Sequence, residues 1–403
     1  MRKRDALPGN QMNRVRFPVA GLVLAAIGLV LAAGDAAAGS VRFATFNASM
    51  HRGAGGELAA ALASGTDPQI AKVAAIVRTV DPDVILVNEF DYGPGNDRSF
   101  VASYLGGAYP FSFIAPSNTG LATGLDLDGD GIVGKVAGTF ERARDSHGFG
   151  TFEGQYGMVV LSKHAIDSGA VRTFRTFRWK DLPRARLPVR ADGSSFYSED
   201  ALAILRLSSK SHWDVPIRID GEVVHLLASH PTPPVFDGPE DRNGLRNADE
   251  IRFWKDYIEA ADYLRDDEGR AGGLPSGAHF VIAGDLNADP VDGESVPGAA
   301  RQLTGHPLVN ASVTPESEGA AAAALAQGKA NVRHRGAARF DTADFRDRAP
   351  GNLRVDYVLP SAGLAITDAG VYWPEEGEPG SALLDASDHR LVWVDVALPV
   401  ASR

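Results

Sequence analysis

Short apolar runs that end in polar residues recur along this chain, and they constrain its fold more than any other feature. The run 84–87 contains only valine, isoleucine and leucine. A run that is apolar on both faces suits a strand in the centre of a buried sheet. The alternating run 41–46 and the largely apolar runs 223–228 and 280–283 also lead into polar residues. The pattern predicts a sheet-rich core with polar side chains gathered at the strand ends, namely Asn47, Glu89, His230, Asp285 and Asn287.

Helical signals lie between the predicted strands. Asp67 followed by Pro68 has the form of an N-cap with proline at the first helical position. Asn247, with Glu250 three residues later, resembles a capping box that opens a helix carrying apolar residues up to Leu264. Strands and helices in mixture, without strict alternation, predict an α/β fold with two mixed β-sheets packed face to face and flanking helices outside.

Two segments are predicted to add little to this core. Residues 93–150 are rich in glycine and polar side chains and are expected to run over the surface. Residues 312–340 contain an alanine run, which favours a helix or a loop insertion. A strand over 353–359 is expected to carry Asp356. The chain shows no fixed-period repeat and no long linker, so the part after the N-terminal segment is interpreted as one domain.

The first 38 residues have the organisation of a signal peptide. Basic residues precede an uninterrupted small and apolar run at 19–33, and an alanine triplet ends at Ala38. The run is short for a bilayer span of about 20 residues. We therefore expect cleavage after Ala38, a domain over 39–403, and a secreted or periplasmic protein. An uncleaved membrane anchor is the alternative, and it is the one membrane association that the sequence suggests.

The chain contains no cysteine and carries a formal net charge of −11. Disulfides and thiolate metal sites are therefore excluded, and any metal must bind oxygen or imidazole ligands. A protein that holds long nucleic acid by its backbone usually presents a basic face. The acidic balance thus argues against a processive or high-affinity nucleic-acid binder, although it is compatible with local basic patches.

Several of the polar residues suit metal-assisted chemistry. Glu89 follows four apolar residues, and a carboxylate in such a place is costly unless it is paired or binds a cation. Asp285 and Asn287 are two residues apart, so both project to the same side if the strand continues. Asp388 and His389 place a carboxylate beside an imidazole, which suits metal coordination together with proton transfer.

The order of these motifs resembles the endonuclease/exonuclease/phosphatase superfamily, which has the deoxyribonuclease I-like fold. The resemblance is to a secreted, bacterial-type member and covers residues 45–389. It implies a four-layered α/β sandwich that hydrolyses phosphoesters with Mg²⁺ or Mn²⁺. Six short motifs carry it: Thr45-Phe46-Asn47, Asn88-Glu89, Ser229-His230, Gly284-Asp285-Leu286-Asn287, Arg354-Val355-Asp356-Tyr357 and Ser387-Asp388-His389.

The resemblance also implies roles for the residues at these positions. Glu89 is expected to be the principal metal ligand, with help from Asn47 and Asp388. Asp285 is expected to orient or deprotonate the attacking water.

The remaining members of the set are expected to act on the phosphate. Asn287 is expected to hold the water and the phosphate oxygens, and His389 to contact the scissile phosphate while Asp356 fixes its tautomer. His230 is expected to be a second imidazole on the phosphate side. One position departs from the family pattern, because Asn88 stands where glutamine usually precedes the acidic ligand. The substrate contacts of that glutamine are therefore in doubt here.

An acidic run outside these motifs suggests a second metal. Asp126, Asp128 and Asp130 alternate with other residues and are followed by glycine, as in the first half of a calcium loop. Ala137 stands at the twelfth position, where an EF-hand has glutamate. A structural Ca²⁺ and a solvated Asp/Gly turn are both open interpretations.

Basic and aromatic residues are the candidates for contacts with substrate. Residues 172–190 contain seven basic residues and a single acid, with aromatic side chains between them. Such a patch can receive an anionic substrate, but a solvated connection is the commoner outcome. Arg242 and Arg246 are candidates for the phosphate site, and Tyr156 suits either a phosphate contact or the core.

These observations together predict a secreted, divalent-metal-dependent phosphoester hydrolase, with a phosphodiesterase or nuclease as the leading hypothesis. The alternatives are a phospholipid or small-molecule phosphodiesterase or phosphatase, and a non-catalytic extracellular binding module on the same fold. The expected partner is a phosphoester, with nucleic acid among the candidates, and no stable protein partner is implied. The substrate stays open because loops select it on a shared scaffold.

Overall fold

The first of two β-sheets brings the N-terminal strand against the C-terminal strand. The computed structural model describes residues 39–399, so the predicted signal peptide, residues 1–38, lies outside the described residues. The strand order is β13 (Ala365–Val371), β14 (Val392–Ala397), β1 (Ser40–Asn47), β2 (Val84–Asn88), β4 (Met158–Ser162) and β3 (Phe111–Phe113). Strands β1 and β2 are parallel with Asn47 opposite Asn88, and the other neighbours are antiparallel. The polar ends of β1 and β2 therefore lie at the same edge.

The second sheet gathers the remaining motif strands. Its order is β12 (Asp356–Pro360), β9 (His279–Asp285), β8 (Glu222–Ser229), β7 (His212–Ile219) and β5 (Ala165–Ile166), and β6 (Arg172–Thr173) also pairs with β7. Strand β8 is parallel to β9. Strand β12 is antiparallel to β9 and places Asp356 opposite Asp285. A separate two-stranded ladder joins β10 (Ala343–Asp344) and β11 (Asn352–Leu353).

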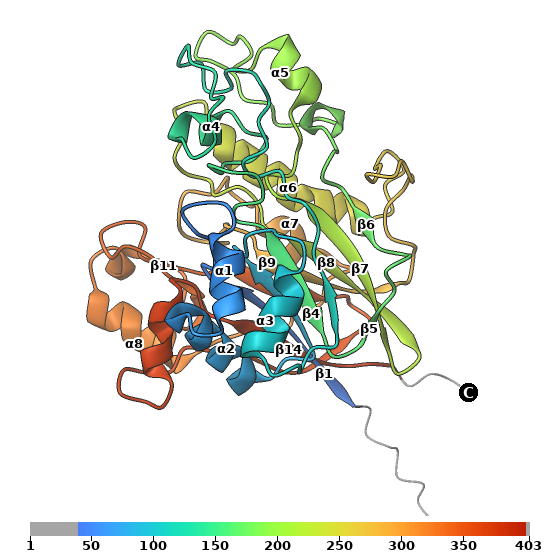
Figure 1. The fold of residues 1–403 in the computed structure, drawn as a ribbon, viewed down its shortest axis with the longest axis vertical. Coiled ribbons are helices and arrows are strands. Elements are labelled where there is room, and N and C mark those ends of the chain that lie inside the picture. Colours follow the sequence, from blue (N-terminus) through green and yellow to red (C-terminus); the bar gives the residue numbers. More distant parts are fainter. Residues whose placement is uncertain (1–38, 400–403) are drawn as a thin grey trace, which may run out of the picture. The chain divides into compact units, whose positions relative to one another are not determined.

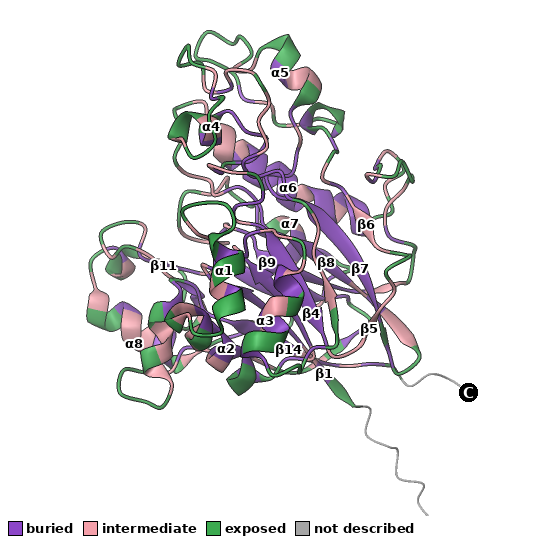
Figure 2. Ribbon diagram, viewed as in Figure 1, coloured by how far each residue is buried: buried purple, intermediate pink, exposed green. Residues whose placement is uncertain are grey.

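Three apolar clusters hold these sheets and helices in four layers, as predicted. One cluster lies between the sheets and includes Phe43, Leu86 and Trp213. A second packs helices α1 to α3 onto the other face of the first sheet, and a third packs α6 onto the second sheet. Figures 1 and 2 show the buried strands with α1, α2 and α3 beside one another over the first sheet. The helices are α1 (Glu57–Ser64), α2 (Pro68–Val80), α3 (Asn96–Tyr104), α4 (Phe140–Arg144), α5 (Glu199–Ile204), α6 (Arg242–Ile258), α7 (Arg301–Thr304) and α8 (Glu318–Gln327), with 3₁₀ segments η1 (Trp179–Asp181), η2 (Asn331–Arg333), η3 (Ala338–Phe340) and η4 (Ser381–Ala386).

Two helices follow their sequence signals. Asp67 caps α2, because its side chain accepts hydrogen bonds from the backbone amides of Gln69 and Ile70. The alanine run forms the middle of α8, so the helical alternative for that segment is confirmed.

The predicted start of α6 was wrong. The helix begins at Arg242, and it ends at Ile258, before Leu264. Asn247 lies inside the helix, fully buried, and its amide donates to the carbonyls of Thr232 and Leu286. Buried polar side chains on a helix face can bind the backbone of neighbouring loops. The same pair of residue types therefore occurs here without marking the start of a helix.

Two further expectations are corrected. Residues 93–150 are not only a surface excursion, because they contain α3 and β3, and Phe100 of α3 is fully buried in the core. The strand predicted over 353–359 is divided between β11 and β12, and Asp356 begins β12 instead of following an apolar run. Within residues 39–399, no helix has the length and apolar character needed to cross a bilayer.

Gly284 permits the close approach of β9 to β8. Its φ is +149°, and a Cβ at this position would lie 2.0 Å from the carbonyl oxygen of Ser229. We predict that Gly284→Ala lowers the free energy of unfolding by about 1–3 kcal/mol, because the strand must shift to relieve the clash. Thermal and chemical denaturation would measure the change. In Gly169→Ala the new Cβ meets no atom closer than 3.9 Å, so this control should unfold like the native protein. Equal stability of the two variants would contradict the packing described here.

Candidate active site

The strand ends of both sheets surround one cavity of about 1060 Å³. Its lining includes seven of the residues predicted from the sequence, namely Glu89, Tyr156, His230, Asp285, Asn287, Asp388 and His389. Asn47 and Asp356 lie behind this surface, each 1% exposed, and both contact residues that line it. The edge where the strands end thus brings together side chains that are more than 300 residues apart in sequence, such as Asn47 and His389.

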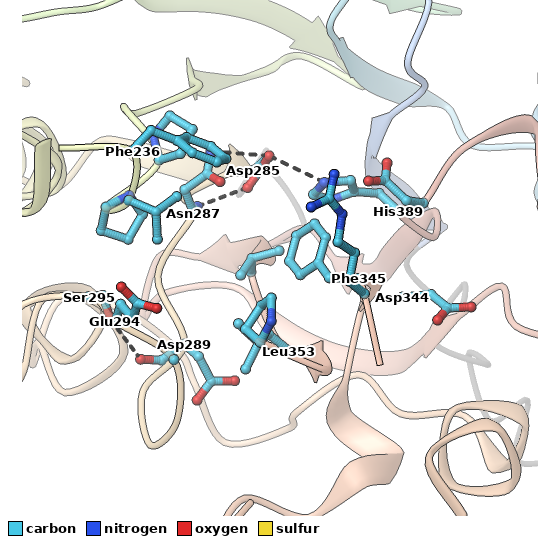
Figure 3. Close-up of a pocket in the computed structure, with 18 of the residues that line it drawn as sticks. Phe236, Asp285, Asn287, Asp289, Glu294, Ser295, Asp344, Phe345, Leu353 and His389 are labelled. Atoms are coloured by element: carbon cyan, nitrogen blue, oxygen red, sulfur yellow. Dashed lines mark hydrogen bonds and ion pairs between the residues drawn. The ribbon is translucent and has the colours of Figure 1, made fainter. Parts of the chain in front are cut away.

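Asp285 is the centre of the arrangement. Its Oδ2 accepts hydrogen bonds from Asn47 Nδ2 at 3.0 Å and from Asn287 Nδ2 at 3.3 Å, and its Oδ1 accepts from the Asn287 backbone amide at 2.8 Å. His230 Nε2 and His389 Nε2 lie 3.4 Å and 3.8 Å from the same Oδ2. Figure 3 shows Asp285 between Asn287 and His389. Burial raises the pKa of Asp285 more than His389 lowers it, so the ionised carboxylate is a strong proton acceptor.

His389 lies between two buried carboxyl groups. Its Nδ1 donates to Asp356 Oδ2 at 2.9 Å, while Nε2 is directed towards Asp285. Burial alone would lower the pKa of His389, but Asp356 and Asp285 outweigh this effect and raise the pKa to about 10. The imidazole is therefore held as a cation with a fixed orientation, which suits contact with a phosphate oxygen.

Thr342 supports the pair of Asp356 and His389 through the Asp356 carboxylate. Its hydroxyl donates to Asp356 Oδ2 at 2.8 Å and accepts from the backbone amides of Val355 and Asp356, each at 3.0 Å. Thr342 is 1% exposed. A single hydroxyl thus fixes both the carboxylate and the start of β12.

His230 has the opposite electrostatic character to His389. Burial lowers its pKa well below the usual value, and Lys210 and His389 lower it further, while Glu89 opposes them. The ring is consequently neutral at pH 7, and its Nδ1 is buried without a hydrogen-bond partner among the described residues. The cavity therefore has one cationic and one neutral imidazole on either side of Asp285.

Glu89 follows β2 in the left-handed region, with φ +57°, which turns its side chain into the cavity. His51 Nδ1 donates to Glu89 Oε2 at 2.8 Å, and the His51 ring packs on Tyr156 with a centroid distance of 4.6 Å. Burial alone would raise the pKa of Glu89, but the His51 hydrogen bond and the charges of nearby histidines lower it to about 2. Oε1 makes no hydrogen bond within residues 39–399, so an anionic oxygen faces the cavity.

A short serine network positions the other acidic side chain. Ser387 Oγ donates to the carbonyl of Asn47 at 2.7 Å and lies 3.1 Å from Ser49 Oγ. Ser49 Oγ in turn donates to Asp388 Oδ1 at 3.4 Å. Asp388 is exposed at the rim of the cavity, and this network ties it to the end of β1.

Oxygen donors of this kind fit a hard divalent cation. Mg²⁺ prefers carboxylate and carbonyl oxygens and keeps several waters. Glu89 and Asp388 offer carboxylates at the cavity wall, and Asn47 lies behind them. A second grouping also exists, because Asp285, Asp356 and His389 present potential ligand atoms within 4.8 Å of one another. In that group the hydrogen bond to Asp356 already engages His389 Nδ1.

Asn88, the departure from the family pattern, is buried beneath the site. Its Oδ1 accepts from the Asp285 backbone amide at 3.3 Å and from Thr45 Oγ1 at 3.2 Å, and its Nδ2 donates to the carbonyl of Ser229 at 3.4 Å. Asn88 therefore joins β2 to β8 and β9 and supports the site from behind.

The other candidates lie away from this cavity. Arg242 forms an ion pair with Glu240, and Arg246 donates to the carbonyls of His147, Arg206 and Leu207. In the basic segment 172–190 the aromatic residues Phe174, Phe177 and Trp179 are buried, and Arg172 is paired with Asp266. These aromatic residues therefore belong to the core, and the segment fits the interpretation as a connection better than that of a substrate-binding patch.

The acidic run of the predicted calcium loop is gathered in space. Asp126, Asp128 and Asp130 place one carboxylate oxygen each within 4.8 Å of the others. Arg144 forms ion pairs with Asp128 and Asp130, while Asp126 accepts backbone hydrogen bonds from Gly129 and Gly131. The geometry is compatible with either a Ca²⁺ site or an Asp/Gly turn closed by an arginine.

Sequence comparison agrees with this arrangement of residues. Residues 44–389 match the sequence profile of the Endonuclease/Exonuclease/phosphatase family. The chain belongs to this family. The members of this family hydrolyse phosphoesters with the help of a divalent metal. This protein is therefore a metal-dependent phosphoesterase.

Solved structures with similar folds come from several bacteria. An endonuclease/exonuclease/phosphatase from Beutenbergia cavernae is 17% identical, with 90% of this chain and 74% of that chain covered and a TM-score of 0.49. Sphingomyelinase C from Streptomyces griseocarneus is 15% identical (89% and 98% covered, TM-score 0.46). A Staphylococcus aureus beta toxin with bound magnesium ions is 12% identical (88% and 99% covered, TM-score 0.44). A search of curated protein sequences finds no match.

Sequence reasoning missed His51, Ser49 and Thr342. His51 and Ser49 follow the first motif closely, so their position beside Asn47 was the available signal. Thr342 belongs to a segment with no recognisable pattern, and only the pairing of β10 with β11 places it under Asp356.

Thr342 provides a test of the phosphoesterase site that does not depend on the substrate. In Thr342→Val, two buried backbone amides lose their acceptor, and Asp356 Oδ2 loses one of its two hydrogen bonds. Leaving such groups unsatisfied costs about 1–3 kcal/mol each, so we predict a clear fall in the free energy of unfolding measured by urea denaturation. Thr79→Val removes an exposed helical hydroxyl that donates to the Ala75 carbonyl, and it should change stability little. A Thr342→Val protein as stable as this control would show that the hydroxyl does not support β12.

Proposed function

We propose that this chain hydrolyses phosphodiesters, with nucleic acid as the leading substrate class, by direct attack of water and without a covalent enzyme intermediate. The observation that carries the proposal is the buried Asp285 carboxylate. It is held by Asn47 and Asn287 beside His389, in a cavity large enough for a phosphodiester and its flanking groups. Such a carboxylate can orient a water and accept its proton.

The side chains around Asp285 divide the remaining tasks. Asn287 donates to the water or to a phosphate oxygen when a substrate replaces its present partner. His389, held as a cation by Asp356, stabilises the negative charge that develops on the phosphate. His230 presents a neutral imidazole, which suits a hydrogen bond to a non-bridging or leaving oxygen.

Glu89, Asn47 and Asp388 are the proposed residues that hold Mg²⁺ or Mn²⁺. When bound, the ion supplies Lewis-acid stabilisation of the phosphoryl oxygens. His51 positions Glu89 through the 2.8 Å hydrogen bond, and Tyr156 packs on His51, so Tyr156 acts indirectly as well as through any contact with substrate.

The alternative of a non-catalytic binding module is less well supported. Burial of Asp285, His389 and Asp356 together incurs a large desolvation cost. Simple ligand binding does not need such a proton-transfer arrangement. A phospholipid or small-molecule phosphodiester remains the competing substrate class within the same mechanism.

Asp285→Asn tests the proposed chemistry. We predict that it lowers the rate on bis(p-nitrophenyl) phosphate and DNA by at least about 100-fold, because a general base typically contributes 10²–10⁴. A chelator should abolish activity, and Mg²⁺ or Mn²⁺ should restore it. Asp368→Asn, on the exposed strand β13, is the matched control and should behave as the native protein. Full activity in Asp285→Asn would refute the mechanism, whereas activity on phospholipid alone would change only the substrate class.

We also propose that the protein is exported and that residues 1–38 are removed. The support is the basic segment followed by the apolar run and the alanine triplet. N-terminal sequencing of the protein recovered from outside the cytoplasm of a bacterial host should begin at Gly39. A cell-bound product that begins at the start methionine would instead favour the membrane anchor.

A further inference from the structure

A second cavity, of about 510 Å³, adjoins the proposed active site. Glu89, Tyr156 and His230 line both cavities, as do Pro233, Val235 and Phe236. The remaining walls come from loops and helices within 127–149 and 197–246, including the first turns of α6. A group that occupies this second cavity would therefore lie next to a phosphate held at Asp285.

Lys210 lines this cavity, and its ammonium group has no carboxylate partner among residues 39–399. Its side chain is buried, and within the described part of the chain its hydrogen bonding is limited to the Pro231 carbonyl at 3.5 Å. Burial lowers the pKa of Lys210, although Glu250, Asp285 and Glu89 oppose this effect. A buried cation is costly when nothing compensates its charge, and an anionic ligand would supply that compensation.

Two further polar groups beside Lys210 lack partners. Thr232 Oγ1 and His230 Nδ1 are buried and make no hydrogen bond among residues 39–399. The Thr232 backbone is fixed, because its amide donates to Glu250 Oε2 at 2.6 Å. Within residues 39–399, Lys210, Thr232 and His230 thus line one small cavity and carry polar atoms without a good partner at or just beneath its surface. Such a set matches the several oxygens of a phosphate group.

The other basic residues of this cavity are already engaged. Arg144 pairs with Asp128, Arg242 pairs with Glu240, and Arg246 donates to three backbone carbonyls. Asp128 and Glu240 thus balance the charges of Arg144 and Arg242. Lys210 and Arg246 have no acidic ion-pair partner in the described part of the chain, and of the two Lys210 makes the fewer hydrogen bonds.

The outer wall of the cavity is aromatic and exposed. Phe140 and Phe149 pack edge to face with a centroid distance of 5.5 Å and are 59% and 47% exposed. Phe236, on the wall shared with the larger cavity, is 89% exposed. Exposed rings around a cationic floor suit a planar base attached to a phosphate. A polyol phosphate would leave these rings in water.

We infer that this second cavity is a subsite for a terminal nucleotide next to the scissile bond, with the base against Phe140, Phe149 and Phe236 and the terminal phosphate on Lys210 and Thr232. The inference rests on the proposed phosphodiesterase function and refines its substrate class. It implies a preference for chains that end in a phosphate one nucleotide away from the bond that is cleaved.

The preference can be measured with two dinucleotides. Thymidylyl-thymidine with a 5′-terminal phosphate and the same compound without it differ only in the group that Lys210 would bind. A charge-assisted hydrogen bond contributes enough for about a tenfold higher kcat/KM on the phosphorylated compound. Bis(p-nitrophenyl) phosphate, which has no terminal phosphate, reports the underlying phosphodiesterase activity in the same preparation.

Variants of residues that line the second cavity test whether the preference for the phosphorylated dinucleotide arises there. Lys210→Met keeps the side-chain stem and should reduce the kcat/KM ratio of the two dinucleotides to about one. Thr232→Val should lower the ratio as well, and it serves if Lys210→Met does not fold. Lys180→Met, at an exposed position in η1, is the matched control and should keep the native ratio.

The outcomes separate this inference from the proposed function. A ratio near one in the native protein, with bis(p-nitrophenyl) phosphate still hydrolysed, overturns the subsite and leaves the function intact. If no phosphodiester is hydrolysed, the proposed function fails, and calorimetric binding of the two dinucleotides decides on the subsite. Tighter binding of the phosphorylated compound that Lys210→Met removes would support the subsite, and equal affinities would overturn it.

Discussion

One carboxylate oxygen, Oδ2 of Asp285, joins the two halves of the sandwich. Asn47 from the first sheet and Asn287 from the second both donate to it, and two imidazoles lie within 3.8 Å. Because Asp285 is 1% exposed, each of these contacts compensates for lost hydration. The positions of the strand ends are therefore coupled through a group that cannot be left without partners.

The backbone around Asp285 is arranged to allow this concentration of polar groups. Gly284 lets β9 approach β8 closely, and the register of β12 brings Asp356 opposite Asp285. Asn88 then satisfies the Asp285 amide from the first sheet. The outcome is a polar centre with one cationic and one neutral histidine, because Asp356 and Asp285 raise the pKa of His389, whereas burial and the charge of Lys210 lower that of His230.

The fold class and parts of the site were predictable from the sequence. These predictions succeeded wherever a local pattern of residues matches the final structure. The apolar run of β2 and the N-cap at Asp67 depend on near neighbours, so both were predictable. Asn247 was misassigned because a capping box and a buried helix-to-loop contact share the same residues. Thr342 could not be identified, because its importance comes from a loop that the fold brings against Asp356, and His51 was missed although it closely follows the first motif. Motif order supplied the remaining positions, and their individual roles stay predictions.

A double-mutant cycle on Asp285 and His389 tests most directly whether these residues act as one unit. The measurement is kcat/KM on bis(p-nitrophenyl) phosphate with Mg²⁺ for Asp285→Asn, His389→Ala and the double variant. Residues that act together on one phosphate lose activity non-additively. The double variant should therefore be about as impaired as the worse single variant. Losses that multiply would mean that the two side chains contribute independently, and this would contradict a site organised around Asp285.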